Sequence, residues 1–240
     1  GAAVAYSLRK LKSTTTNVVR VRRSSDNLEQ NFSASQITDG TLTTFCGSGN
    51  GFVTTIYDQV GSNNMIQTLG SRQGILVNSG VLNTLNGKPI ILRSVDDNGG
   101  YLSTYPPNGT GKSLFYVGKI ERTRNCILGS LNGNSDYGYL SDSSSTATTT
   151  KSNITVTNEK INGANAIYST RLDLYNLTFN QFLLTTNINF IFQDNVLVIG
   201  YRASNPSAFG MYQFQEMMIF DNQLNTISIT TNINNYYTIY

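Results

Sequence analysis

The carboxylates are the first residues of this chain to weigh for chemistry, because histidine is absent. Its 240 residues include 14 Asp plus Glu and no His, which excludes Ser-His-Asp triads and His-ligated zinc or iron. Carboxylate, Lys, Tyr and Ser/Thr chemistry remain. A glycosidase needs two carboxyl groups, about 5 Å apart in a retaining enzyme and wider in an inverting one. Glu216 on an alternating segment and Asp136 in a Gly/Asn-rich stretch are candidates, but the sequence alone does not bring them together.

Tyrosines flanking expected loops are candidates for sugar contacts. Tyr101, Tyr105, Tyr137 and Tyr139 occupy such positions, and Trp is absent from the chain. A Tyr ring stacks on the apolar face of a sugar while its hydroxyl forms a hydrogen bond. A Tyr at a loop also commonly caps the edge of a β core, so both interpretations stay open.

The segment Tyr57-Asp58-Gln59 closes an apolar strand and enters Gly61-Ser-Asn-Asn64. Its side-chain oxygens suit either Ca²⁺, which takes oxygen ligands, or an Asx turn, in which the carboxylate accepts from its own backbone. We favour the turn, because no second acidic residue follows nearby. Arg20 and Arg22 fall on one face of a strand by alternation, where they would contact an anion or form a solvated face paired with a carboxylate such as Asp26. We favour the solvated face.

Two further patterns have simple structural interpretations. The stretch Pro106-Pro-Asn-Gly-Thr-Gly-Lys-Ser113 is similar to a phosphate-binding loop, but a Pro stands where the first Gly is needed and a strand follows instead of a helix. It predicts a turn. Cys46 and Cys126 lie beside apolar residues and are expected to be free, buried thiols.

The composition indicates a folded domain with a neutral polar surface. Charged residues make up 13% and hydrophobic residues 39%, and Asn and Thr number 29 and 28. A net charge of +3 without a basic cluster argues against nucleic-acid binding.

No apolar run reaches the roughly 18 residues that span a bilayer. The start, Gly1-Ala-Ala-Val-Ala5, lacks Met and is not a signal peptide, so we expect a fragment of a longer protein.

Frequent turns and short apolar runs predict an all-β fold. Asn-Gly pairs such as Asn86-Gly87 and Asn162-Gly163 favour hairpin turns. The pattern predicts helices at Ala2–Leu11 and over the C-terminal residues from Leu224 to Tyr240. The expected strands are Val18–Arg23, Phe52–Tyr57, Pro89–Ser94, Ser113–Lys119, Cys126–Leu131, Asn153–Thr157, Ala166–Thr170, Asn189–Gln193, Val196–Tyr201 and Tyr212–Phe220. About ten strands without a linker indicate one domain spanning residues 1–240, folded as a two-sheet sandwich or jelly roll.

Several stretches together resemble a known family. Ala5-Tyr-Ser-Leu-Arg-Lys-Leu11, Val19-Arg-Val-Arg-Arg-Ser-Ser-Asp-Asn27 and Gly49-Asn-Gly-Phe-Val-Thr-Thr-Ile-Tyr-Asp-Gln59 are similar to the start of the catalytic domain of family 54 α-L-arabinofuranosidases. They resemble even more closely the arabinofuranosidase-like, concanavalin-A-like domains of phage tail and virion proteins. Gln215-Glu-Met-Met-Ile-Phe-Asp221 and Asn235-Tyr-Tyr-Thr-Ile-Tyr240 look like the last strand and closing helix of that fold.

The resemblance implies a two-sheet, concanavalin-A-like or laminin-G-like jelly roll but does not carry over the family's catalytic residues. The family's nucleophile is a Glu in a Gly-Asn-Ala-Glu stretch after paired cysteines, whereas Cys126-Ile-Leu-Gly-Ser-Leu-Asn-Gly-Asn134 contains no Glu. Its general acid is an Asp in a Gly-Gly-Asp-Asn stretch, whereas Ile199-Gly-Tyr-Arg-Ala-Ser-Asn205 contains no Asp. The second Cys of its early disulfide, which would follow Cys46, is also missing.

The sequence therefore predicts an all-β, antiparallel jelly-roll sandwich with short N-terminal and C-terminal helices and no enzyme activity. We expect a lectin-like module of a phage virion or tail, which binds host-surface glycan or acts in virion structure. The alternative is an active α-L-arabinofuranosidase-type hydrolase. The expected partners are a glycan, other virion subunits or a second copy of the chain. We expect no cofactor, with Ca²⁺ left open by the fold family, and a location on the virion or outside the cell. The expected glycan-binding residues are Tyr137, Tyr139, Arg202 and Asn205.

Overall fold

The computed structural model describes residues 1–93, 100–106, 109–120, 125–126, 128–129, 139–191, 197–199 and 212–240. Its strands form a β-sandwich, and every strand pairing in the described residues is antiparallel. The prediction of an all-β sandwich is thereby confirmed.

The elements run in the following order along the chain. The N-terminal part comprises β1 (Val4–Ser7), β2 (Val19–Arg23), β3 (Glu29–Phe32), α1 (Ala34–Thr38), α2 (Thr41–Cys46), β4 (Gly51–Ile56), β5 (Met65–Ile66), the 3₁₀ turn Gly70–Arg72, β6 (Ile75–Asn78), β7 (Val81–Leu82), β8 (Thr84–Leu85), β9 (Lys88–Pro89), β10 (Ile91–Arg93) and β11 (Tyr101–Ser103). The C-terminal part comprises β12 (Gly109–Lys119), β13 (Asn125–Cys126), β14 (Leu140–Ser141), β15 (Ile154–Ile161), β16 (Ala164–Asn165), α3 (Arg171–Thr178), β17 (Phe182–Phe190), β18 (Leu197–Ile199), β19 (Tyr212–Phe220) and α4 (Ile227–Tyr237).

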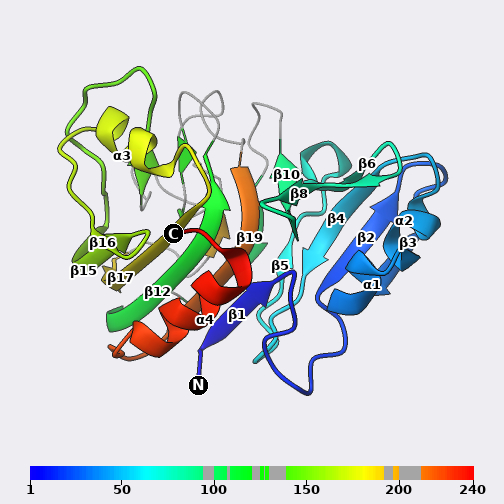
Figure 1. The fold of residues 1–240 in the computed structure, drawn as a ribbon, viewed down its shortest axis with the longest axis horizontal. Coiled ribbons are helices and arrows are strands. Elements are labelled where there is room, and N and C mark those ends of the chain that lie inside the picture. The colour runs from blue at the N-terminus through cyan, green and yellow to red at the C-terminus, as the bar shows by residue number, and fades with distance from the viewer. Residues whose placement is uncertain are drawn as a thin grey trace.

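The long strand β19 joins the two halves of the fold. It pairs with β12 along one edge; along the other edge its first part pairs with β10 and its second part with β1. The strands continue from β12 through β17, β15 and β16 in one direction, and from β10 through β6 and β4 in the other. Figure 1 shows these two groups at opposite ends of the molecule, with β1 and β19 between them.

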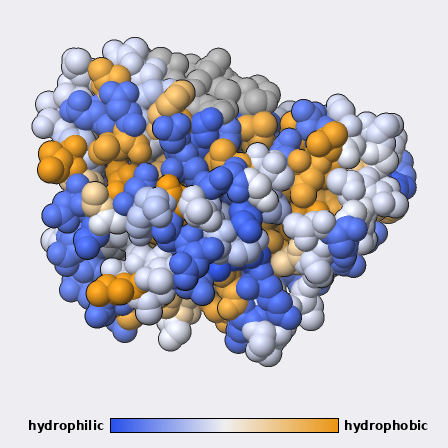
Figure 2. Space-filling view, in the orientation of Figure 1, coloured by the Kyte–Doolittle hydropathy of each residue, from blue (hydrophilic) through white to orange (hydrophobic). Residues whose placement is uncertain are grey.

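Two apolar clusters lie on opposite sides of the central strands. The large sandwich core includes Val4 and Tyr6 of β1 together with Leu114, Phe214 and Met217. The smaller cluster fills the space under α4, which crosses the outer face of the sheet (Figure 1). Its members are Ala5, Phe115, Val117, Leu183, Met218, Ile233 and Tyr237. Figure 2 shows that the surface on this side is largely hydrophilic, interrupted by separate hydrophobic groups. No helix among the described residues is both long and apolar enough to cross a membrane.

The prediction of an N-terminal helix was wrong. Residues 4–7 form strand β1, in which all four residues are buried. Their side chains alternate: Val4 and Tyr6 enter the sandwich core, while Ala5 and Ser7 face α4. Ala-rich helix propensity is a weak preference, and pairing with β19 together with burial on both faces overrides it. The predicted C-terminal helix is confirmed as α4.

The strand predicted at Ala166–Thr170 was also wrong. Only residues 164–165 form a strand, and Thr170 is the N-cap of α3. Its hydroxyl accepts from the Asp173 N–H, and the Asp173 carboxylate accepts from the Thr170 N–H. This reciprocal capping box is a helix-start signal that β-propensity obscured. A second capping box, between Ser33 and Gln36, begins the helix α1.

Two predicted Asn-Gly hairpins are present. Asn86-Gly87 connects β8 to β9 and Asn162-Gly163 connects β15 to β16, with all four residues at positive φ as a type I′ turn requires. By contrast, Gly51 begins strand β4. Cys46 is a free, buried thiol as predicted, and burial raises its pKa to about 11. The side chain of Cys126 lies outside the described part.

A buried ion pair fastens β1, β19 and α4 to one another. The Arg9 guanidinium donates to both carboxylate oxygens of Glu216, from Nε at 2.7 Å and from Nη2 at 2.9 Å. The Ser7 and Tyr237 hydroxyls also donate to Glu216, and Arg9 donates to Asn232 of α4. Only 1% of the Glu216 side chain is exposed. This carboxylate is therefore fully used by the fold.

We predict that Glu216→Gln lowers the free energy of unfolding by about 3–5 kcal/mol, because it leaves Arg9 buried without its counter-charge. Glu29→Gln is the matched control, since Glu29 pairs with Arg20 at the surface and should cost about 1 kcal/mol or less. Urea denaturation measures both values. Equal losses in the two variants would contradict a dominant role for the buried pair.

Candidate functional site

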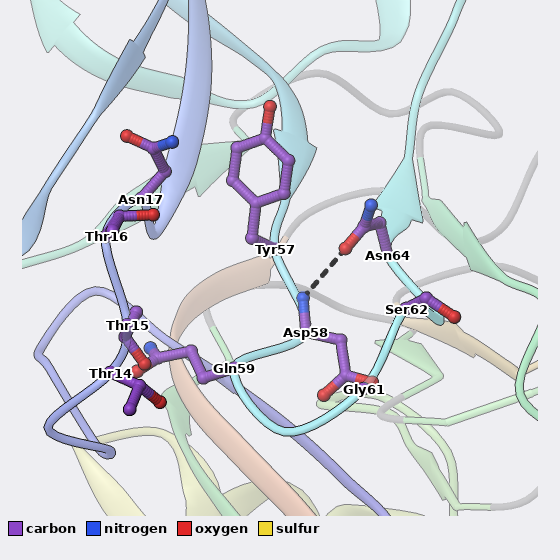
Figure 3. A pocket seen from close by; sticks show the side chains of 10 residues that line it. All are labelled: Thr14, Thr15, Thr16, Asn17, Tyr57, Asp58, Gln59, Gly61, Ser62 and Asn64. Carbon is purple, nitrogen blue, oxygen red and sulfur yellow. Dashed lines mark hydrogen bonds between the residues drawn. The ribbon is translucent and has the colours of Figure 1, made fainter.

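A polar hollow of about 340 Å³ opens between two loops at the edge of the sandwich (Figure 3). One loop leads from the end of β1 toward β2, and the other follows β4. The lining residues are Thr14, Thr15, Thr16, Asn17, Tyr57, Asp58, Gln59, Gly61, Ser62 and Asn64. Among the described residues that line it, Asp58 carries the one formal charge and there is no cation.

Asp58 lines the hollow and accepts hydrogen bonds from the loop that follows β4. Its Oδ1 accepts from the N–H groups of Ala5 at 3.0 Å and Val60 at 3.2 Å, and its Oδ2 accepts from the Asn63 N–H at 3.3 Å. The Asp58 N–H donates to Asn64 Oδ1 at 3.0 Å (Figure 3). The bond to Val60, two residues ahead, is the predicted Asx turn. No cluster of three metal-ligating side chains occurs in the described part of the chain.

Gln59 ties this loop to the N-terminal segment. Its Oε1 accepts from the Leu11 N–H at 2.8 Å, and its Nε2 donates to the carbonyls of Ser7 at 3.0 Å and Arg9 at 2.8 Å. A single buried amide therefore satisfies three backbone groups beyond the end of β1. These three hydrogen bonds fix the path of residues 7–11, just before residues 14–17 form the opposite wall of the hollow.

The opposite wall is the segment Thr14–Asn17. The Thr15 N–H donates to the Lys12 carbonyl in a turn, and the Thr15 hydroxyl oxygen is buried without a hydrogen-bond partner. Tyr57 is held by its N–H, which donates to the Val18 carbonyl, and by its hydroxyl, which donates to Asn31 Oδ1 at 2.8 Å. The aromatic ring is thus rigid. This wall was not predicted from the sequence, although the run Thr14-Thr-Thr-Asn17 is its visible signal.

Of the four predicted glycan-binding residues, the structure describes one, Tyr139. Tyr137, Arg202 and Asn205 lie outside the described residues. Tyr139 is completely buried, and burial raises the pKa of its hydroxyl well above the ordinary value. Its ring packs beside the Lys151 ammonium, which pairs with Glu159. Tyr139 is thus a core residue, and the glycan-binding role of the set stays a prediction.

The remaining sequence candidates have structural roles wherever they are described. Tyr101 is buried, with its hydroxyl donating to the Val53 carbonyl, and Tyr105 donates to Asp221, which also accepts from Lys112. Arg20 and Arg22 are half-buried on one face of β2, where Arg20 pairs with Glu29 and Arg22 donates to Gln73 and Asn27. Asp26 pairs with Arg23 instead. Residues 109–119 form strand β12 rather than a phosphate-binding loop followed by a helix.

Glu216 is not available as a catalytic carboxylate, because it lies under α4 and is saturated by Arg9, Ser7 and Tyr237. Asp136, the other candidate, lies outside the described residues. The pair of carboxylates considered from the sequence is therefore not supported.

Comparison with known proteins identifies the fold. No family model and no curated protein matches the sequence. Among solved structures, the chain is similar to a GH54 α-L-arabinofuranosidase soaked with a cyclic sulfate inhibitor (TM-score 0.55, 15% identity). It is also similar to a variant of a GH54 arabinofuranosidase soaked with 4-nitrophenyl α-L-arabinofuranoside (TM-score 0.54, 14% identity), and to an arabinofuranosidase complexed with arabinofuranosyl-α-1,2-xylobiose (TM-score 0.52, 14% identity). Each match covers 98% of this chain and 62% of the other.

This likeness defines the class of fold as that of the arabinofuranosidase β-sandwich. It also corrects one prediction. The expectation that the chain is not an enzyme rested on missing family carboxylates, and it is overturned because all three similar structures are glycoside hydrolases. At 14–15% identity, single catalytic positions cannot be aligned reliably by short motifs. The absence of Glu or Asp from two such motifs therefore does not exclude glycosidase activity.

We predict that Asp58→Ala destabilises the protein by about 2–4 kcal/mol, because three backbone N–H groups lose their acceptor. Asp58→Asn retains Oδ1 and should cost less. Thermal or urea denaturation compares the two variants.

Ca²⁺ and a chelator should leave the melting temperature of the wild type unchanged, since the Asp58 oxygens already accept N–H groups. A rise with Ca²⁺ that disappears in Asp58→Ala would contradict the Asx-turn interpretation.

Proposed function

We propose that this chain is a carbohydrate-active domain that hydrolyses α-L-arabinofuranosides or closely related furanosides. The observation that carries the proposal is the extent of the structural likeness: 98% of the chain matches arabinofuranosidases whose structures contain an arabinofuranoside, an inhibitor or an arabinosylated xylobiose. The low charge and the abundance of Asn and Thr support it, because amide and hydroxyl groups suit neutral sugar hydroxyls.

The carboxylates of the described residues are already engaged. Asp26, Glu29, Glu159, Glu216 and Asp221 form ion pairs, while Asp39, Asp58, Asp142 and Asp173 accept from backbone N–H groups at turns or caps. Nine of the 14 Asp and Glu are thus accounted for. The proposal assigns the acid and nucleophile to the other five, Asp96, Asp97, Glu121, Asp136 and Asp194, which lie outside the described part.

The substrate partner in this proposal is a neutral glycan, and hydrolysis by two carboxylates calls for no cofactor. A place on a phage virion or outside the cell is a further part of the proposal. It rests on the resemblance of the N-terminal residues alone, and immunogold labelling of purified virions would test it.

The experiment is turnover of 4-nitrophenyl α-L-arabinofuranoside by the wild type and by five variants: Asp96→Asn, Asp97→Asn, Glu121→Gln, Asp136→Asn and Asp194→Asn. We expect two of them to lose about 10²–10⁴-fold in kcat while keeping the wild-type melting temperature, as removal of a catalytic acid or nucleophile does.

Glu29→Gln, which removes only a surface ion pair, is the control and should retain full turnover. Absence of turnover by the wild type on arabinofuranosides, xylosides and galactofuranosides would refute the proposal. Undiminished turnover in all five variants would refute the assignment of the carboxylates.

A further inference from the structure

We propose that the polar hollow between Thr14–Asn17 and the loop after β4 is an ancillary binding site for a neutral oligosaccharide. Binding of a sugar there does not depend on hydrolysis. Three features support the proposal: the charge of the hollow, one unsatisfied hydroxyl and a neighbouring hollow.

The charge of the hollow selects a neutral ligand. Asp58 is its single ionisable acid, and both of its carboxylate oxygens already accept backbone N–H groups. In the described part of the chain, no Lys or Arg lines the hollow. A phosphate, sulfate or uronic acid would thus lose its hydration without gaining a counter-charge. Hydroxyl groups of a sugar, in contrast, can exchange hydrogen bonds with Thr and Asn side chains.

Thr15 supplies the second observation, because its hydroxyl oxygen is buried and unpaired. A buried hydroxyl without a partner costs free energy, and a ligand toward which the Thr15 side chain turns supplies the partner and recovers that cost. In Figure 3 the Tyr57 ring rises between the Asn17 and Asn64 side chains. The arrangement combines a rigid aromatic surface with amides on both sides, which suits a sugar ring with one apolar face and hydroxyls at its rim.

A second hollow of about 650 Å³ adjoins the first and shares Thr15 and Thr16 with it. Ser33, Ser35 and Gln36 contribute to its lining, and Lys10 is its one charged residue. Two mainly polar hollows that share Thr15 and Thr16, each with one charged residue among its described lining, accommodate two linked rings better than a single sugar. We therefore infer an oligosaccharide of at least two neutral residues.

The test is titration of the protein with xylobiose, arabinofuranosyl-α-1,2-xylobiose and lactose, with digalacturonic acid as the charged comparison, followed by calorimetry or NMR. We expect binding of at least one neutral probe and weaker binding of the charged one. Thr15→Val should lower the affinity for the neutral probe about 3- to 10-fold, which corresponds to the loss of one hydrogen bond. Thr157→Val, on the exposed part of β15, is the matched control and should leave affinity unchanged.

Stability separates a binding role from a structural one. Removal of an unpaired hydroxyl should leave the melting temperature of unliganded Thr15→Val equal to or above that of the wild type. Binding of the probes is measured separately from turnover of 4-nitrophenyl α-L-arabinofuranoside, so failure of the hydrolase proposal is seen independently; Thr157→Val should match the wild type in both measurements. Neutral probes that bind Thr15→Val and wild type equally, no binding of any neutral probe, or a lowered melting temperature in Thr15→Val would each overturn the proposal.

Discussion

The buried ion pair between Arg9 and Glu216 is the interaction on which the rest of the structure depends. It forms where β1 ends against β19, and α4 covers it. A charge pair with 1% of the Glu216 side chain exposed is costly unless every oxygen is satisfied, and Ser7 and Tyr237 complete that requirement. The pair thus selects one register of β1 and one position of α4. It also fixes the point from which the chain leaves for the polar hollow.

Beyond the end of β1, the chain is held by side-chain hydrogen bonds to the backbone instead of by strand pairing. Gln59 holds the carbonyls of Ser7 and Arg9, and Asp58 holds the Ala5 N–H, so the loop after β4 is attached to β1 by two adjacent residues. Such contacts satisfy buried backbone groups that a sheet edge would otherwise leave unpaired. The hollow therefore lies where the loop after β4 is attached to β1, and Asp58 and Gln59, which make that attachment, belong to its polar lining.

The sequence predicted the parts of this fold that depend on local pattern. Alternation identified β2, β4, β12 and β19, Asn86-Gly87 and Asn162-Gly163 specified hairpins, and Asp58 was correctly interpreted as an Asx turn. The errors come from long-range contacts. Residues 4–7 form a strand because β19 and two apolar clusters surround them, and Glu216 is neutralised by a residue 207 positions away. Local pattern does not contain either fact, nor the juxtaposition of Thr15 with Tyr57. Likewise, two short motifs do not reveal the likeness of the fold to glycoside hydrolases that overturned the expectation of no enzyme activity.

The central claim is that this β-sandwich is a carbohydrate-active domain. A crystal structure of the protein soaked with arabinofuranosyl-α-1,2-xylobiose tests it most directly, because the same sugar is bound in one of the structures that the chain resembles. The account predicts sugar density in the hollow beside Thr15 and Tyr57, together with intact or cleaved arabinose at a second place that is lined by carboxylates. Crystals that stay free of sugar at saturating concentration would contradict the claim.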